Sequence, residues 1–507
     1  MNFKKSLTYN NKFTNEYKMN INNNINNNIN NLDDLDDLNN NKSNYNDTIV
    51  IDNRCLLIEY IKNNFNIKDL YYNIFTEKLE ELFGSFIYYG SKDEDDKYLL
   101  INKNLINGDN NIDELNNFST TIYQKNPFKK LISFMDPIMT NNNAIINLKN
   151  VETTKFKELY IKNCIEGINI MLLYDDKETN NWKLITEKSL LGIDINFRNK
   201  KIIDLYNDII TSKNIELDKL NKQKIYNFIL VHNKNNGIVN YNHYGSGYKE
   251  LYLNMIIEEK DNKLIYDFNP NISIFKKNIK VANRIIFNNV NDFIDNINNI
   301  SYDNMVNKKI TLEGFNIYKV DDNNIINMKI QTHIYQQILN IKPKYTNIHI
   351  GYLEMYQENK LKEYLPYLTN YHSEIIHRIS MSIRTISKEF LDLYHYLKKY
   401  KNSELYINMP SNYKKVLYKI HGIYIDSRKN DFNNNTDVNN ENKLESKSIT
   451  VHDIYHYLKS LSITFLKELY FDRENIIKEK KIHVPLYNLF SIDCIYTNIQ
   501  TKLMMNL

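Results

Sequence analysis

Between about residues 150 and 335, apolar residues come in short runs that predict strands. Examples are INIMLLYD, WKLIT, YNFILVH and FNIYKV, each bounded by Asn, Asp or Gly. Short apolar runs between turn residues are typical of β-strands. We therefore expect an antiparallel β-rich domain over residues 151–340, with helices between some of its strands.

After Gln331 the apolar period becomes helical. One stripe repeats at alternating steps of three and four and predicts a long amphipathic helix: Ile376, Ile379, Ile383, Ile386, Phe390, Leu393 and Leu397. Another helix is expected to open at Thr450, whose hydroxyl can pair with the backbone while Asp453 reaches back. Its expected buried face is Val451, Ile454, Tyr455, Leu458 and Phe465. Residues 341–500 thus read as a helical domain, and the fold class is α+β.

Two polar low-complexity runs interrupt this pattern. Residues 1–48 hold NINNNINNNINNLDDLDDLNNN, with too few large apolar groups to offset the entropy of ordering, and predict a disordered tail. Residues 429–448 are similar but lie between helical patterns, and so predict a disordered insert. Residues 49–150 predict an N-terminal α/β segment that is part of the β-rich domain or packs on it.

Composition excludes several classes of protein. The chain has 507 residues, 42% of them apolar, and a formal net charge of +4, so a sizeable core is possible and charge alone implies no nucleic-acid partner. Cys55, Cys164 and Cys494 lack metal or redox spacing. No apolar run is long enough to span a bilayer, so no membrane partner is expected. The many Asn residues fit an AT-rich genome and carry little functional information.

Candidate chemistry lies in four segments of the β-rich region. In KNCIEGINIMLLYD, Glu166 lies two positions after Cys164, so on a strand the two would share a face, and Gly167 follows directly. In TLEGFNIYKVDDNNIINMKIQTHIY, Glu313 and Gly314 are expected to end one strand, with Lys329 on the next.

The other two segments lie between these. WKLITEKSLLG presents Thr186 and Lys188 after a strand, and YNFILVHNKNNGIV holds Ile229 on an aromatic strand before an Asn-rich turn. Any one segment is weak evidence, because Glu-Gly pairs are common in turns, but four in one order are more specific.

In this order the segments resemble the covalent nucleotidyltransferase superfamily, and the RNA ligases of phage type in particular. The resemblance covers about 180 residues and implies an ATP-grasp-like ligase domain. It further implies binding of ATP, or alternatively GTP, with Mg²⁺, and action on RNA ends. The arrangement is also similar to ligase-like proteins of large nucleocytoplasmic DNA viruses, which implies the host cytoplasm or the virion as location.

The resemblance also implies roles for single residues. Glu166 and Gly167 match the family's acidic and glycine positions around the nucleotide, and Thr186 and Lys188 the groups on its sugar or phosphate. Glu313 with Lys329 matches the acidic-glycine strand and the Lys-x-Lys strand that contacts phosphate. Tyr335 lies on the following amphipathic segment.

Three departures from the family's pattern affect its chemistry. Cys164 stands where the nucleophilic lysine belongs, Gln331 replaces the second lysine, and Ile229 replaces an acidic residue. Lys162 would point to the same face as Cys164 but about 6.6 Å away along the strand. It is therefore either a displaced nucleophile or, as the plainer interpretation, a surface lysine at a strand end.

Several alternatives remain open. The chain is a ligase-like enzyme with altered chemistry, a pseudoenzyme that only binds nucleotide, or a viral structural protein whose helical domain contacts a protein or RNA. Asp93, Asp95 and Asp96 are weakly similar to the carboxylates of poly(A) polymerases, although an all-charged run favours a solvated loop. His452 and His456 share a helix face but lack the glutamate of a zinc protease.

Overall fold

All four strands that we predicted between residues 150 and 335 form. The computed structural model describes residues 48–83, 97–103, 115, 118–175, 182–195, 200–234, 237–245, 247–270, 278–282, 284–321, 324–342, 348–367, 372–401, 403–433 and 448–478. The described residues from Ile49 onward belong to one compact unit. The chain is a mixed α+β protein with largely antiparallel sheets, as expected.

The larger sheet has seven strands in the order β1-β11-β10-β9-β7-β8, with the short β12 paired in parallel to β10. In that order the strands are β1 (Thr48–Asp52), β11 (Lys263–Asp267), β10 (Lys249–Lys260), β9 (Lys224–His232), β7 (Ile168–Tyr174), β8 (Trp182–Thr186) and β12 (Lys280–Val281). Helix α7 (Ile202–Lys213) packs on this sheet through a shared apolar cluster that includes Leu205, Ile209 and Leu253.

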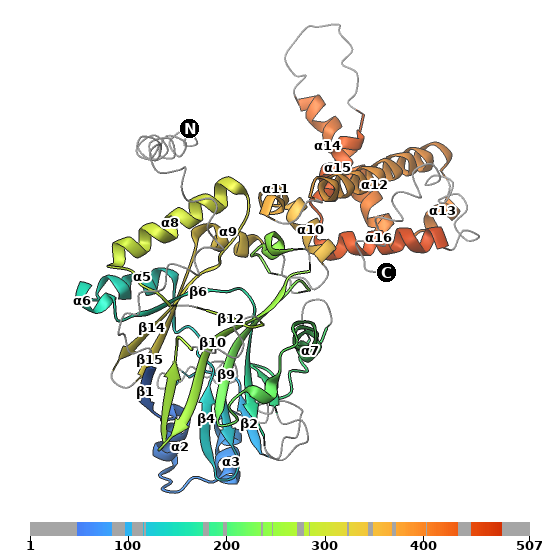
Figure 1. Ribbon diagram of the computed structural model, residues 1–507. Helices are drawn as coiled ribbons and strands as arrows, with labels where there is room; N and C mark the ends of the chain where they lie inside the picture. The colour runs from blue at the N-terminus through green and yellow to red at the C-terminus, as the bar shows by residue number, and fades with distance from the viewer. Residues whose placement is uncertain are drawn as a thin grey trace, which may run out of the picture. The chain divides into compact units, whose positions relative to one another are not determined.

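The second sheet has five strands in the order β13-β6-β14-β15-β5. They are β13 (Arg284–Ile285), β6 (Tyr160–Cys164), β14 (Gly314–Asp321), β15 (Asn324–Gln331) and β5 (Met139–Thr140). One face packs its Phe315, Ile317, Met328 and Ile330 against α5 (Asn141–Lys149) and α8 (Val290–Asn307), which lie beside these strands in Figure 1. Because side chains alternate along a strand, the other face is left for polar residues.

Residues from the N-terminal segment enter both sheets through β1 and β5. The same segment forms a three-stranded sheet of β2 (Tyr98–Ile101), β3 (Thr121–Gln124) and β4 (Lys129–Ser133). Helices α2 (Leu56–Phe65) and α3 (Tyr72–Phe83) bury Leu57, Phe75 and Leu79 against it. A further cluster joins Ile49, Leu100 and Ile132 to Met171 and Met255 of the large sheet.

The C-terminal part is helical, as the period predicted. Its elements, with the short helices of the β-rich part, are α6 (Thr153–Phe156), η5 (Leu217–Lys219), η6 (Tyr241–Tyr244), α9 (His333–Ile341), α10 (Ile348–Gln357), α11 (Leu361–Tyr364), η8 (Leu365–Tyr367), α12 (His372–Tyr400), α13 (Ser403–Asn408), α14 (Ser411–Asn433), α15 (Val451–Lys459) and α16 (Ile463–Lys478). One cluster contains the buried α12 stripe together with Tyr335 and Ile338 of α9, so the helices and the end of the β-rich region share a core.

Two details of the helical prediction are corrected. The capping box of Thr450 and Asp453 is present, but the helix ends at Lys459 and Phe465 belongs to α16. The break arises at Ser462, whose hydroxyl accepts from the backbone N–H of Phe465 and so begins a new helix. The insert was expected from residue 429, yet α14 continues to Asn433.

Other predictions lie outside the described residues. These are the tail over residues 1–47, the rest of the insert up to Lys447, the acidic run Asp93, Asp95 and Asp96, and Cys494. Among the residues that are described, no helix has the length and apolarity needed to cross a bilayer. His452 and His456 contact each other at 3.0 Å on α15, and no described group of three or more His, Cys, Asp or Glu is arranged to hold a metal ion.

Candidate nucleotide pocket

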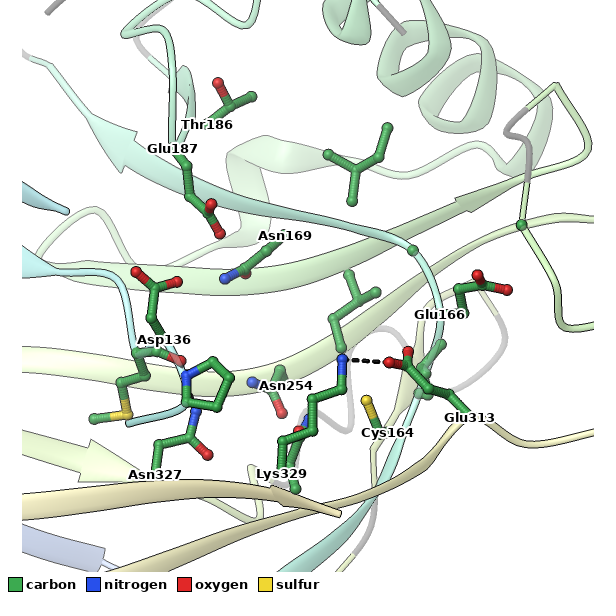
Figure 2. Close-up of a pocket in the computed structure, with 18 of the residues that line it drawn as sticks. Asp136, Cys164, Glu166, Asn169, Thr186, Glu187, Asn254, Glu313, Asn327 and Lys329 are labelled. Atoms are coloured by element: carbon green, nitrogen blue, oxygen red, sulfur yellow. Dashed lines mark hydrogen bonds and ion pairs between the residues drawn. The ribbon is translucent and has the colours of Figure 1, made fainter. Parts of the chain in front are cut away.

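A cavity of about 720 Å³ lies over the polar face of the five-stranded sheet. Its floor is formed by alternate residues of β6, β14 and β15, whose neighbours point into the opposite core: Cys164, Asn316, Tyr318, Asn327 and Lys329. Its other wall comes from the seven-stranded sheet, through Asn169, Ile229 and Asn254. The pocket is therefore built where the two sheets face each other, as Figure 2 shows.

The segments singled out in the sequence meet in this pocket. Every predicted site residue except Lys162 and Gln331 lines it: Cys164, Glu166, Gly167, Thr186, Lys188, Glu313 and Lys329. Ile229, which replaces the family's acidic residue, lines it as well, and so does Tyr335. Glu166 and Tyr335 are 169 positions apart in the sequence, so only the fold brings these segments together.

Glu166 follows β6 and is held in place by the turn after β9 and by α9. One carboxylate oxygen accepts hydrogen bonds from the backbone N–H groups of Ile238 at 2.6 Å and Val239 at 2.5 Å, and the other accepts from the Tyr335 hydroxyl at 2.9 Å. A Cβ on Gly237 would lie 2.7 Å from this carboxylate, so glycine permits the close approach. Burial raises the pKa of Glu166.

Cys164, Glu313 and Lys329 form a buried cluster on the pocket floor. The Lys329 ammonium makes an ion pair with the Glu313 carboxylate, and Figure 2 shows this ion pair beside the Cys164 sulfur. Cys164 and Glu313 are each 4% exposed. Burial raises the pKa of the Cys164 thiol, which opposes formation of a nucleophilic thiolate.

Thr186 and Lys188 lie on the opposite side of the pocket, at the end of β8. The buried Thr186 hydroxyl donates to the Asp194 carboxylate at 2.9 Å and accepts from the backbone N–H of Ser189 at 3.0 Å. These bonds shape the turn that carries Lys188, whose side chain is exposed. Thr186 therefore has a clear role in positioning the turn, and Lys188 is the group that can reach a ligand.

Lys162 and Gln331 lie outside the pocket lining. The Lys162 ammonium donates to the backbone carbonyl of Asn254, and the residue is 1% exposed, so the expectation of a surface lysine is wrong. The physical reason is that β6 is an inner strand whose polar face is covered by β10 of the other sheet. Gln331 donates to Glu313 at 2.9 Å and so supports a residue of the pocket floor.

Sequence reasoning missed several lining residues. Asp136, Asn169, Glu187, Asn254 and Asn327 line the pocket, and Figure 2 places Asp136 and Glu187 on the side away from Glu313. Burial and the nearby Asp136 charge raise the pKa of Glu187. The asparagines gave no usable signal in a chain so rich in Asn, whereas Glu187 lies between two residues that the sequence did single out.

Comparisons with known proteins find similarity only at the level of structure. No protein-family model matches the chain, and no curated protein matches it. One similar solved structure is form 2 of an archaeal ATP-dependent RNA ligase, with 11% identity and a TM-score of 0.34. The match covers 62% of this chain and 83% of the ligase chain. Its form 1 gives 10% identity, a TM-score of 0.33, and coverage of 62% and 82%.

A putative ATP-dependent DNA ligase from Aquifex aeolicus is also similar, with 15% identity, a TM-score of 0.29, and coverage of 56% of this chain and 70% of the ligase. At such identities the similarity concerns the fold alone. The chemistry of the pocket must therefore be inferred from its own residues.

Proposed function

We propose that this chain is a divergent ligase-like nucleotidyltransferase that binds ATP, or alternatively GTP, in the pocket between its two sheets and acts on RNA ends. The observation that carries the proposal is the convergence of the four predicted segments on one cavity. Segments chosen for their order in the sequence have no reason to meet in an unrelated protein.

The charges of the lining suit a nucleoside triphosphate. Lys188, Lys329 and Lys342 line the cavity and supply cations for phosphate oxygens. The volume of about 720 Å³ lies within the range of pockets that hold molecules of this size. Ile229, 7% exposed, adds an apolar surface against which a base or ribose can pack.

The residues present also fit a magnesium ion that arrives with the nucleotide. Mg²⁺ is usually held by one or two carboxylates together with substrate phosphates. Asp136 and Glu187 would hold it, and the effect of Asp136 on the pKa of Glu187 places their charges close together. When bound, the ion would neutralise phosphate charge.

The proposal is tested by equilibrium dialysis of the purified full chain against radiolabelled ATP and, separately, GTP, each with Mg²⁺. Lys188→Ala should weaken binding by about tenfold to a hundredfold, because a charge-assisted hydrogen bond contributes about 1.5–3 kcal/mol. The control is Lys219→Ala, an exposed lysine paired with Glu216 outside the pocket, which should bind as the wild type does. Absence of binding by the folded wild type to both nucleotides would refute the proposal.

A second assay addresses the nucleic-acid substrate. We expect transfer of the nucleotide to, or joining of, single-stranded RNA that carries a terminal phosphate, observed as a mobility change on a denaturing gel. RNA lacking the terminal phosphate is the control. Binding of ATP without any product would leave a nucleotide-binding pseudoenzyme as the function.

A further inference from the structure

The pocket floor contains an amine beside the position where the sequence lacks a lysine. In the five-stranded sheet, Cys164 pairs with Gly314, and Gly314 pairs in turn with Gln331. Lys329 is two residues from Gln331 on the same face. Because Gly314 has no side chain, the flexible stem of Lys329 can cross above β14, and Figure 2 shows its ammonium, paired with Glu313, beside the Cys164 sulfur.

We propose that Lys329, not Lys162 or Cys164, is the nucleophile that accepts the nucleotide, with Glu313 as its proton acceptor. This inference rests on the proposed function, since it requires ATP in the same pocket. It assigns Lys329 a covalent role in place of the phosphate contact that the resemblance implies.

Transfer of the nucleotide begins with a proton. The Lys329 ammonium gives one proton to the Glu313 carboxylate, and the resulting amine attacks the α-phosphorus of ATP. A nitrogen–phosphorus bond forms while the bond from that phosphorus to the bridging oxygen breaks, and pyrophosphate leaves with the electron pair. The amine nitrogen then loses its second proton to solvent. The product is a lysine phosphoramidate of AMP, and no oxidant, reductant or further reactant is required.

The surroundings of Lys329 set its resting charge and show why the proposed step needs a proton acceptor. Burial works to lower the pKa of Lys329, but its partners Cys164 and Glu313 outweigh burial and raise the pKa overall. The resting state is thus an ammonium with its proton acceptor already in contact.

The other candidate nucleophiles are less well placed. The Lys162 ammonium donates to the backbone carbonyl of Asn254, and Lys162 itself does not line the pocket. Lys342 lines the pocket after α9, burial lowers its pKa, and it interacts electrostatically with Glu166 and with Glu313. Lys329 lines the pocket floor and makes an ion pair with Glu313, which supplies a proton acceptor in direct contact.

The test is covalent labelling of the full chain by ATP radiolabelled at the α-phosphate, with Mg²⁺, followed by denaturing electrophoresis and peptide mapping. Lys329→Arg keeps a cation for Glu313 but cannot act as the nucleophile at ordinary pH. We expect the wild type to be labelled on the peptide that contains Lys329. Lys329→Arg should take up at least about a hundredfold less label. Lys162→Met, the control, should be labelled as the wild type is. A phosphoramidate should also lose its label in acid and keep it in alkali.

Equilibrium ATP binding measured on the same preparations separates the two claims. Loss of label in Lys329→Arg with ATP binding retained supports the assignment. Label retained in Lys329→Arg, or wild-type label found on a peptide other than the one containing Lys329, overturns it. A wild type that binds ATP but takes no label overturns this inference and leaves the proposed binding intact, whereas absence of binding overturns both.

Discussion

At the scale of single residues, the main feature of this pocket is that the Lys329 ammonium lies beside the Cys164 sulfur. Cys164 occupies the position that the family resemblance assigns to the nucleophile, and Lys329 brings its ammonium to that sulfur from β15. An amine on another strand can serve the same chemistry if the distance to the phosphorus is preserved. The two residues should therefore be interchangeable in position.

The double variant Cys164→Lys with Lys329→Cys tests this interchange. It preserves the composition and one ammonium for Glu313, and we expect covalent labelling by ATP to move to the peptide containing position 164. Peptide mapping of the labelled protein measures the change. Label that remains elsewhere, in a double variant that folds and binds ATP, would contradict the view that the two positions are equivalent.

The buried Glu166 carboxylate predicts a dependence of stability on pH. Burial raises its pKa in the folded state, so the unfolded chain releases this proton at lower pH than the folded chain does. The free energy of unfolding should therefore fall as pH rises from the ordinary glutamate range toward the raised value, and this contribution should be absent in Glu166→Gln. Urea denaturation across that pH range measures it.

The hydrogen bonds that Glu166 accepts should stabilise the turn containing Ile238 and Val239. Glu166→Ala leaves two backbone N–H groups and the Tyr335 hydroxyl without their acceptor, which should lower the free energy of unfolding by about 1–3 kcal/mol. Glu166→Gln retains an acceptor oxygen and should cost less. Equal losses in the two variants would show that the hydrogen bonds to Glu166 are unimportant.

At the scale of elements, the sheet requires glycine at position 314. A Cβ there would lie 2.0 Å from the Ile330 carbonyl oxygen, so Gly314→Ala must separate β14 from β15 and should cost about 1–3 kcal/mol of stability. The control is Gly422→Ala in α14, where a Cβ meets nothing within 4 Å and should stabilise by about 0.5–1 kcal/mol. Thermal unfolding of both variants gives the comparison.

The sequence predicted individual strands and helices better than it predicted which of them pack together. The strands β7, β8, β9 and β14 and the stripe of α12 follow directly from local apolar periods. The burial of Lys162 does not, because the strand that covers it, β10, begins 87 residues after Lys162. Asp136 was missed for the same reason: only the pairing of β5 with β15 brings its segment to the pocket.

At the scale of the whole molecule, the pocket and the C-terminal helices share a core. Tyr335, which donates to Glu166, belongs to the apolar cluster that contains Ile383, Phe390 and Leu458 of the helical part. Disruption of these helices should therefore reach the pocket. A single unfolding transition is expected for both parts.

The buried ion pair of Arg473 and Glu389 in the helices provides a test of this coupling. Arg473→Met removes the Arg473 guanidinium from the buried Glu389 carboxylate and should lower the free energy of unfolding by about 3–5 kcal/mol. On heating, ATP binding should be lost in the same transition as the circular dichroism of the helices. The double variant with Glu389→Leu removes both charges and should recover most of the loss. Separate transitions for binding and for helix content would contradict the shared core.

Every proposal for this molecule requires a nucleotide in the cavity between the two sheets. A crystal structure of the full chain with Mg²⁺ and an ATP analogue that cannot be cleaved between its α and β phosphates tests this most directly. We predict density for the analogue in this cavity, with its α-phosphorus nearer to the Nζ atom of Lys329 than to that of Lys162 or Lys342, and with the ion beside Asp136 and Glu187. If the analogue, at a saturating concentration, bound elsewhere on the chain and left this cavity empty, that result would contradict the account.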